Sequence, residues 1–499
     1  MNKAKRFLAL AILAVMLLPT VAACSEKKPA DTTASSGNTV TNTDTTEEVP
    51  TLLPNGTWYD GHEFKFLIAG NFDNNDFEYE GNTTEPVDYA KYRRMASIQE
   101  KYGVGITNED VIAFNTSNGG GPGFEAMRRS YESGSYDYDA AMIGTYDVSQ
   151  AAYSGFLTDL NSDELSYIDL TKSWWDQKAN ESLMIDGKMF YTTGDISITD
   201  NRITNCIMFN KTLVANTDTM KNPYEMVQAN EWTWDNFTTE VRKISQDLNG
   251  DDVRDQNDLF GLLTWKDAIL AAYSSSGERY ATINSNDEVE LTIYTPKSVS
   301  MISKYIELVQ DSNSVFNYQT LSGGWDAVRI QMFDNDQVAY YLTTLNTVPK
   351  HRDSETDFGI LPIPKYDSEQ ADYGHLVTPF HCQFLCVPFF IEDSERTSGI
   401  IEELAYDGKQ YLTPAYYEET LVGQIVRDDE SADMLDIIFS SAIYDMGMYY
   451  KVGGLHNSLL NMAMTKENTF ASIYESARDV AESDVAKIND NFQNVLGTE

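Results

Sequence analysis

The sequence predicts an α/β fold in which buried strands alternate with amphipathic helices. An apolar run over residues 63–69 ends at a glycine, which is typical of a buried strand. The helix expected next carries an apolar stripe at Met95, Ile98 and Tyr102, and a second buried strand is expected over 138–144. Strands and helices continue to alternate beyond this point, which is the pattern of a parallel sheet covered by helices.

Residues 1–23 have the features of a lipoprotein signal peptide. Three cationic residues precede an uncharged apolar run that is too short to span a bilayer comfortably. The run ends in small residues directly before Cys24, which we expect to be the lipidated first residue of the mature protein. An ordinary signal peptide followed by an incidental cysteine is the alternative. The mature protein is thus expected on the extracellular face of the cell membrane, held there through its lipid anchor only.

Residues 24–50 are predicted to form a disordered tether. They are rich in Thr, Ser, Asp, Asn and Glu and nearly devoid of apolar side chains. Such a segment cannot bury enough surface to offset the entropy of ordering. The chain beyond it contains no further run of eighteen apolar residues, so we expect a soluble body with two or more cores.

The composition argues against some classes of binding partner and against disulfide bonds. With 77 acidic against 36 basic side chains the formal net charge is −41, which disfavours nucleic-acid binding and adhesion to anionic lipids. Besides Cys24 there are three cysteines, Cys206, Cys382 and Cys386. The last two are too far apart along an extended strand to bridge each other, so we expect free thiols.

The segment 247–258 has the ligand spacing of a twelve-residue calcium loop. Oxygen side chains stand at loop positions 1, 3, 5, 9 and 12, and position 7 can offer its backbone carbonyl. The predicted calcium ligands are Asp247, Asn249, Asp251, Val253, Asp255 and Asp258. Position 12 is Asp instead of the longer Glu, and the glycine expected at position 6 stands earlier, at Gly250. We predict a structural calcium ion here, with a solvated acidic turn as the alternative.

The elements on either side of this loop are also predictable. The apolar stripe of an amphipathic helix before the loop is formed by Phe237, Val241, Ile244 and Leu248. Thr233 or Asp235 is expected to cap the N-terminus of this helix. The apolar run 259–263 predicts a short buried strand after the loop.

Several short segments in the middle of the chain form a more specific pattern. They are Trp174-Trp175, Asp186-Gly187-Lys188, Gly194-Asp195, Phe209-Asn210-Lys211-Thr212-Leu213, Pro223-Tyr224, Trp232-Thr233-Trp234-Asp235-Asn236-Phe237, and 358–366. With these segments, and with the calcium-like loop that closes on Gly261, the chain resembles extracellular solute-binding proteins of ABC sugar importers, the family 1 group. The resemblance runs from about Gly144 to about Tyr366, and the C-terminal quarter carries no matching motif.

The resemblance implies a two-lobed, periplasmic-binding-protein-like fold of type II that closes over a carbohydrate in the cleft between its lobes. It also implies delivery of that ligand to ABC permease subunits by a monomer. The chain is expected to cross between lobes near Thr158, Asp357 and Tyr411. Lobe 1 then comprises 51–158 and 357–410, and lobe 2 comprises 159–356 and 411–499.

A sugar site needs flat aromatic faces for the apolar side of the ring and carboxylates or amides for its hydroxyl groups. The candidates that follow expected strands or precede a helix are Tyr146, Asp147, Asp195, Trp265 and Trp325. Each has core or hinge packing as its alternative. An adjacent pair points its side chains in divergent directions, so Trp174 and Trp175 are expected to be structural.

No residue is predicted to be catalytic. His381 adjoins Cys382, but no third group with recognisable spacing accompanies this pair. The glycine-rich segment 118–123 lacks the lysine and hydroxyl residue that end a phosphate-binding loop. Two alternatives to a binding protein remain open: a secreted glycoside hydrolase with two carboxylates across a cleft, and a surface receptor or sensor of the same fold.

Overall fold

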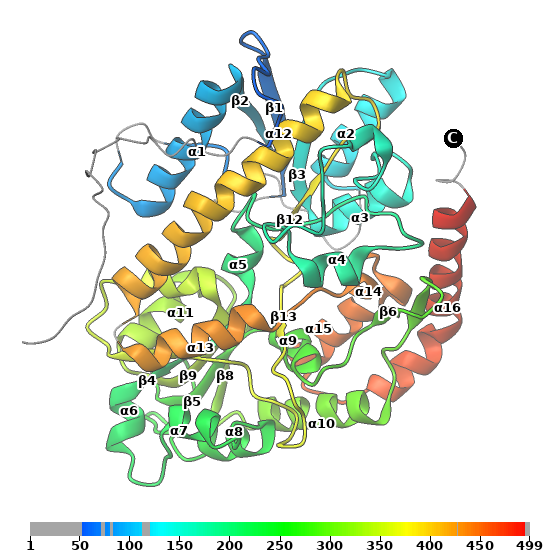
Figure 1. Ribbon diagram of the computed structural model, residues 1–499. Helices are drawn as coiled ribbons and strands as arrows, with labels where there is room; N and C mark the ends of the chain where they lie inside the picture. Colours follow the sequence, from blue (N-terminus) through cyan, green and yellow to red (C-terminus); the bar gives the residue numbers. More distant parts are fainter. Residues whose placement is uncertain (1–51, 71–74, 80–82, 112–119, 427, 495–499) are drawn as a thin grey trace, which may run out of the picture. The chain divides into compact units, whose positions relative to one another are not determined.

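A computed structural model describes residues 52–70, 75–79, 83–111, 120–426 and 428–494 (Figure 1). The predicted signal peptide, the lipidation site Cys24 and the tether lie outside these residues. Among the helices of the described residues, none combines the length and the apolar character that crossing a membrane requires.

One sheet has four strands in the order β12-β3-β1-β2. They are β1 (Glu63–Ala69), β2 (Gly105–Val111), β3 (Ala140–Gly144) and β12 (Gln383–Cys386). β1, β2 and β3 are parallel, and β12 is antiparallel to β3. The strands predicted over 63–69 and 138–144 are therefore confirmed. This sheet is the centre of the first lobe, and the five-stranded sheet described next is the centre of the second lobe. The helices that pack around the first sheet are α1 (Pro86–Tyr102), α2 (Pro122–Ser133), α3 (Thr145–Tyr153) and α12 (Ser394–Asp407).

The second sheet has five strands in the order β10-β4-β9-β5-β8. They are β4 (Asn205–Asn210), β5 (Phe260–Thr264), β8 (Val315–Asn317), β9 (Val338–Thr344) and β10 (Phe358–Leu361). β5 is parallel to β8 and β9, whereas β4 is antiparallel to both β9 and β10. Both sheets are thus mixed, and the expected parallel order holds only for part of each.

The remaining elements fill the space around and between the two sheets (Figure 1). The other helices are α4 (Gln177–Leu183), α5 (Thr199–Ile203), α6 (Lys211–Asn216), α7 (Pro223–Gln228), α8 (Trp234–Val241), α9 (Ala268–Ser275), α10 (Pro296–Gln310), α11 (Trp325–Asp334), α13 (Asp429–Ser440), α14 (Met446–Tyr449), α15 (Leu455–Thr465) and α16 (Phe470–Asn494). Two small sheets pair β6 (Ala281–Ile283) with β7 (Val289–Leu291) and β11 (His375–Leu376) with β13 (Ala442–Ile443).

Short 3-10 and π-helical segments complete the chain. The 3-10 segments are η2 (Asp163–Leu165), η3 (Tyr318–Thr320), η4 (Leu345–His351) and η7 (Val452–Gly454). The π-helical segments η5 (Gly408–Leu412) and η6 (Ala415–Ile425) follow directly on α12.

The structure places all three crossings between the lobes later in the chain than predicted. Thr192 still exchanges backbone hydrogen bonds with Leu385 of β12, so the first crossing lies beyond Thr158, just before β4. β10 belongs to the five-stranded sheet, which moves the second crossing from Asp357 to the segment after Leu361. Tyr411 packs under the Arg93 guanidinium of α1 at 4.2 Å, and the chain reaches the second sheet only with α13.

Helix α8 begins where the sequence predicts and ends earlier. Thr233 is the N-cap, and its side chain accepts a hydrogen bond from the Asn236 backbone NH. The helix stops at Val241, because β5 passes so close that a Cβ on Gly261 would lie 1.9 Å from the Val241 carbonyl oxygen. Glycine is therefore required at position 261 to let the strand approach the end of the helix.

The buried side chains agree with the expected thiol and tryptophan roles, with one difference in geometry. Cys206, Cys382 and Cys386 are unpaired and buried. The indole nitrogens of Trp174 and Trp175 donate to the same carboxylate, that of Glu402 in α12, at 2.9 and 3.0 Å. The two indole NH groups therefore converge on α12, and the expected divergence does not hold for them.

Replacing Gly261 with Ala tests the packing of β5 on α8. We expect Gly261→Ala to lower the free energy of unfolding by about 2–3 kcal/mol, because the new methyl group overlaps a backbone carbonyl that cannot move aside. Gly323→Ala is the matched control, since a Cβ there meets nothing within 4 Å. Thermal and urea unfolding of both variants would measure the difference. Equal stability of the two variants would contradict the close approach.

Candidate functional site

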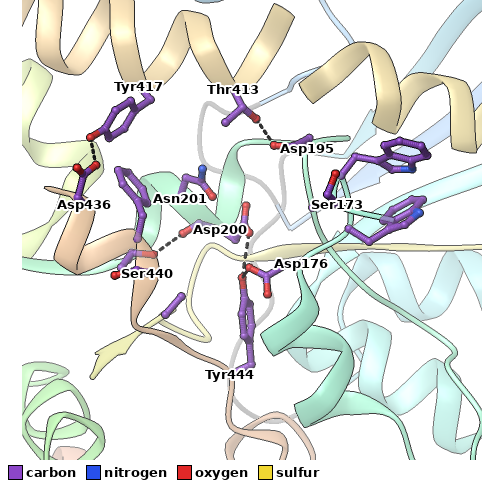
Figure 2. Close-up of a pocket in the computed structure, with 16 residues that line it drawn as sticks. Ser173, Asp176, Asp195, Asp200, Asn201, Thr413, Tyr417, Asp436, Ser440 and Tyr444 are labelled. Carbon is purple, nitrogen blue, oxygen red and sulfur yellow. Dashed lines mark hydrogen bonds between the residues drawn. The ribbon is translucent and has the colours of Figure 1, made fainter. Parts of the chain in front are cut away.

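A cavity of about 550 Å³ opens between the segment that carries α4 and α5 and the segment that carries η6, α13 and β13 (Figure 2). Its size falls in the range of small-molecule sites. The cavity is lined by Ser173, Trp174, Trp175, Asp176, Gly194, Asp195, Asp200, Asn201, Thr204, Thr413, Tyr417, Asp436, Phe439, Ser440, Ala442 and Tyr444. These residues combine four carboxyl groups with five aromatic rings.

Two loops of the first lobe set the positions of Asp176 and Asp195. The Asp176 side chain caps α4 by accepting the Ala179 backbone NH at 2.8 Å. The Asp195 backbone NH donates to the Trp174 carbonyl at 2.8 Å, and a Cβ on Gly194 would lie 2.3 Å from the same oxygen. The close contact at Gly194 therefore brings the two aspartates to one wall of the pocket.

Tyr444 links two of the carboxyl groups. Its hydroxyl oxygen lies 2.9 Å from Asp176 and 3.0 Å from Asp200 (Figure 2). A phenol has one hydrogen, so it can donate to only one of them. Burial and the Asp176 charge raise the pKa of Asp200 to about 8. The Tyr444 hydroxyl therefore bridges the two side chains with one hydrogen, and the raised pKa of Asp200 favours a proton on that carboxyl group.

The other two carboxyl groups each accept a hydrogen bond from a side-chain hydroxyl group. Thr413 donates to Asp195, and Tyr417 donates to Asp436 (Figure 2). Burial raises the pKa of Asp195 to about 6. The site thus brings together carboxyl groups, two of which have a raised pKa, and aromatic surfaces.

Tyr146 lies at a different place, in the first turn of α3. Its hydroxyl is 3.2 Å from His456 Nε2, and its ring packs edge-on against Phe380 with centroids 5.7 Å apart. The Lys451 ammonium lies 4.7 Å from the ring centroid. Tyr146 is 2% exposed, so this cluster joins α3 to α15 and presents little open surface for a ligand.

The other predicted residues are also dispersed. Asp147 is fully buried and accepts the backbone NH groups of Gly121 and Gly123 at 2.9 and 3.0 Å, which fixes the start of α2. Trp265 is buried behind β5. Trp325 is 40% exposed and stacks on Tyr318 with centroids 5.8 Å apart. Of the five predicted residues, Asp195 alone lines the pocket of Figure 2.

The sequence analysis missed most of this pocket. Asp200 follows Asp195 by five residues, and this short acidic spacing was the one local signal available. Thr413, Asp436 and Tyr444 come from the C-terminal part of the chain, where no motif was recognised.

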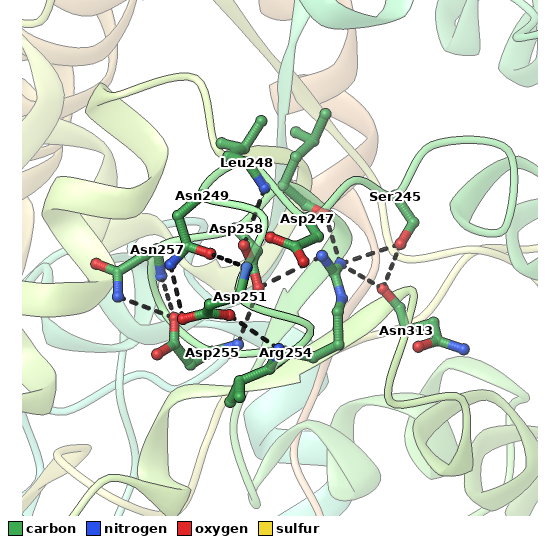
Figure 3. A network of polar contacts seen from close by, with 12 residues as sticks. Ser245, Asp247, Leu248, Asn249, Asp251, Arg254, Asp255, Asn257, Asp258 and Asn313 are labelled. Atoms are coloured by element: carbon green, nitrogen blue, oxygen red, sulfur yellow. Dashed lines mark hydrogen bonds and ion pairs between the residues drawn. The ribbon is translucent and has the colours of Figure 1, made fainter.

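The predicted calcium loop lies between α8 and β5 (Figure 3). Asp247 accepts the backbone NH groups of Gly250 and Asp252, both of which have positive φ. Asp258 is buried, accepts the Leu248 backbone NH, and lies 3.5 Å from the Arg254 guanidinium. In the described part of the chain no three His, Cys, Asp or Glu side chains are grouped to hold a metal ion. Calcium binding at this loop stays a prediction.

Comparisons with known proteins agree with the two-lobed fold. The pattern of the family described as bacterial extracellular solute-binding protein matches residues 84–375, more than half of the chain. A comparison with curated protein sequences gave no match.

Solved structures with the same fold are distant in sequence. An ABC substrate-binding protein from Listeria monocytogenes in complex with cycloalternan has a TM-score of 0.53 and 14% identity, over 88% of this chain and 100% of that chain. The ABC transporter associated binding protein from B. animalis subsp. lactis, in complex with β-1,6-galactobiose, has a TM-score of 0.54 and 14% identity, over 86% and 98%. UgpB from Mycobacterium tuberculosis, in complex with glycerophosphocholine, has a TM-score of 0.57 and 13% identity, over 85% and 99%.

The raised pKa of Asp200 predicts how stability depends on pH. A carboxyl group whose pKa is higher in the folded state than in the unfolded state stabilises the fold below its unfolded pKa, and this contribution is lost as pH rises through the folded value. We therefore expect the contribution of Asp200 to the melting temperature to fall as pH rises from about 4 to about 8, and to be absent above the folded pKa. Asp200→Asn, which keeps the site neutral, should flatten this fall.

Thermal unfolding of Asp200→Asn across pH 5 to 9 measures the effect. The exposed residue Asp218 supplies the control substitution Asp218→Asn, which should reproduce the parent curve. Burial also raises the pKa of Glu402 to about 7, so part of the pH dependence should persist in Asp200→Asn. Parallel curves for Asp200→Asn and the parent protein would refute the assignment.

Proposed function

Because this chain belongs to the family of bacterial extracellular solute-binding proteins, we propose that it captures a sugar or an oligosaccharide by lobe closure and delivers it to the permease of an ABC importer. In this proposal Cys24 carries the lipid that holds the protein outside the membrane, and the protein acts as a monomer without chemistry on the ligand.

The pocket of Figure 2 is the observation that carries the carbohydrate part of this proposal. Carboxyl and amide groups such as those of Asp195 and Asn201 suit the hydroxyl groups of a saccharide, and the lining aromatic rings suit its apolar faces. The pocket also lies between residues of the first lobe and residues of α13, which packs on the second sheet. A ligand held between groups of both lobes favours the closed arrangement over an open one.

Two other functions use the same fold or the same residues. A secreted glycoside hydrolase needs one protonated and one ionised carboxyl group across the sugar, and the raised pKa of Asp200 resembles one half of that pattern. The hydroxyl of Tyr444 lies between Asp200 and Asp176, however, where a hydrolase needs room for the sugar. A receptor or sensor would bind the ligand in the same way and pass the signal to a partner other than a permease.

Ligand binding and ligand recovery test the proposal together. The full chain should show a dose-dependent rise in melting temperature with at least one member of a panel of mono- and oligosaccharides. The saccharide should be recovered unmodified after prolonged incubation, as chromatography would show. Recovery of cleaved product would indicate the hydrolase. An unchanged melting temperature with every saccharide of the panel would contradict sugar binding.

For the loop 247–258 we propose a structural calcium ion that stabilises the second lobe and makes no contact with the sugar ligand. The support is the ligand spacing, together with the positive φ of Gly250 and Asp252, which curls the loop so that several of its oxygens can face inward. Binding would need the Asp258 carboxylate, which lies beside Arg254, to turn toward the ion.

Calcium at a hundredfold excess over its dissociation constant should stabilise the fold by about 2.7 kcal/mol. Chelation should therefore lower the melting temperature while saccharide affinity stays within about threefold. Asp251→Ala should remove the calcium-dependent shift, and Asp218→Ala, outside the loop, should keep it. A large loss of saccharide affinity at unchanged stability would contradict a structural ion, and an absent calcium shift would contradict binding.

A further inference from the structure

The pocket of Figure 2 has few hydrogen-bond donors available to a ligand. The indole nitrogens donate to Glu402, Thr413 and Tyr417 donate to aspartates, and Tyr444 is held between two carboxyl groups. Thr204 and Ser440 donate to backbone carbonyls. Among the described residues that line the pocket, Ser173 and Asn201 are those whose side-chain donors make no hydrogen bond within the protein.

Acceptors, by contrast, are in excess. Asp195 and Asp436 each receive a single side-chain hydroxyl donor, which leaves lone pairs available. Asp200 is 3% exposed, and its Oδ1 has no hydrogen-bond partner among the described residues. A buried acceptor without a partner is costly, and a donor from a ligand would relieve that cost.

The charge of the lining residues has one sign. The sixteen lining residues include four aspartates and no Lys, Arg or His. Lys178 and Lys409 lie nearby, but each donates to a backbone carbonyl, that of Ser440 and that of Ser173 respectively. Burial is the main cause of the raised pKa of Asp200, and the negative charges of Asp176 and Asp195 add to it.

We propose that this pocket takes an amino sugar, whose ammonium group pairs with Asp195 and Asp200 and whose hydroxyl groups donate to Asp436. The inference rests on the proposed function and names the ligand class of that same site. A saccharide that carries an amine supplies the donors and the positive charge that the pocket lacks, whereas a neutral saccharide supplies the donors only. The aromatic lining adds surfaces that attract an organic cation.

A bare metal ion fits these observations less well. In the part of the chain that the structure describes, no three acidic side chains are close enough together to form a metal site. A volume of about 550 Å³ also exceeds what one ion needs, and it is ample for a saccharide. The pocket therefore suits a saccharide better than a single ion.

The test compares amines with their neutral parents on the full chain by calorimetry. The pairs are glucosamine with glucose, galactosamine with galactose, and chitosan oligosaccharides with cello-oligosaccharides, and N-acetylated forms serve as uncharged controls. At least one amine should bind tenfold or more tightly than its parent and its N-acetylated form. Added salt should lower the binding affinity of the amine more than that of the neutral sugar.

Two substitutions assign the effect to the pocket. Asp195→Asn and Asp200→Asn should each lower the affinity of the preferred amine about tenfold, and should lower that of its neutral parent by a clearly smaller factor. The exposed Asp218→Asn should leave both unchanged. If one pocket variant fails to fold, the other variant still tests whether the amine binds in this pocket.

The outcomes separate this inference from the function on which it rests. Neutral sugars that bind as tightly as their amines, or variants that weaken both equally, would overturn the amine assignment and leave the sugar-binding function standing. The absence of binding by every amine and every neutral saccharide would overturn both.

Discussion

Helix α12 carries a row of buried acidic side chains on which the rest of the first lobe depends. Glu402 accepts the indole nitrogens of Trp174 and Trp175. Glu403 accepts the Lys101 ammonium at 2.5 Å, the Tyr102 hydroxyl at 2.8 Å and the backbone NH of Leu52. One helix therefore fixes the first described residues, the end of α1 and the loop before α4. Removing one partner of such a network leaves a buried charge or donor unsatisfied, so the network acts as a unit.

The geometry of the pocket depends on this network and on a second group of contacts, made by Arg94 of α1 and by Asp76. Asp176 follows the two tryptophans directly, so the position of its carboxylate is set by their anchoring to α12. The segment that leads into Asp200 is held by α1, because Arg94 donates to the Ile196 carbonyl at 2.6 Å. Asp76 adds to this by accepting the Ile198 backbone NH at 2.9 Å. The wall that carries Asp176 and Asp200 is thus placed by contacts that lie outside the pocket.

The local elements were predictable from sequence, whereas the assembly of the pocket was not. Period-two and period-3.6 patterns located β1, β3 and the N-cap of α8, because those patterns arise from burial on one face of a single element. The shared acceptor of the tryptophan pair lies 227 residues from Trp175, and no local pattern reports such a contact. The same holds for the pairing of Thr192 with Leu385, which displaces the first crossing between lobes.

The candidate residues of the site show the same difference between what the sequence predicts and what the fold decides. Asp195 and Asp147 were both predicted as candidates because they follow expected strands, yet Asp195 lines the pocket whereas Asp147 holds the start of α2. Sequence supplies the residue type, and only the fold decides whether a carboxylate faces a backbone NH or a cavity. Trp325 illustrates the converse, since it is exposed as a platform should be but lies away from the pocket lining.

The acidity of the chain has two different physical meanings in this structure. Most of its charge is solvated, so water and salt screen it beyond about 10 Å and it discriminates little between one small cation and another. Two carboxyl groups of the pocket are instead desolvated, because burial raises the pKa of Asp195 to about 6 and that of Asp200 to about 8. Ionising them costs free energy that a cationic partner in the pocket would return. Specificity for charge therefore arises where the protein has withdrawn its acids from water, and the net charge of −41 by itself confers none.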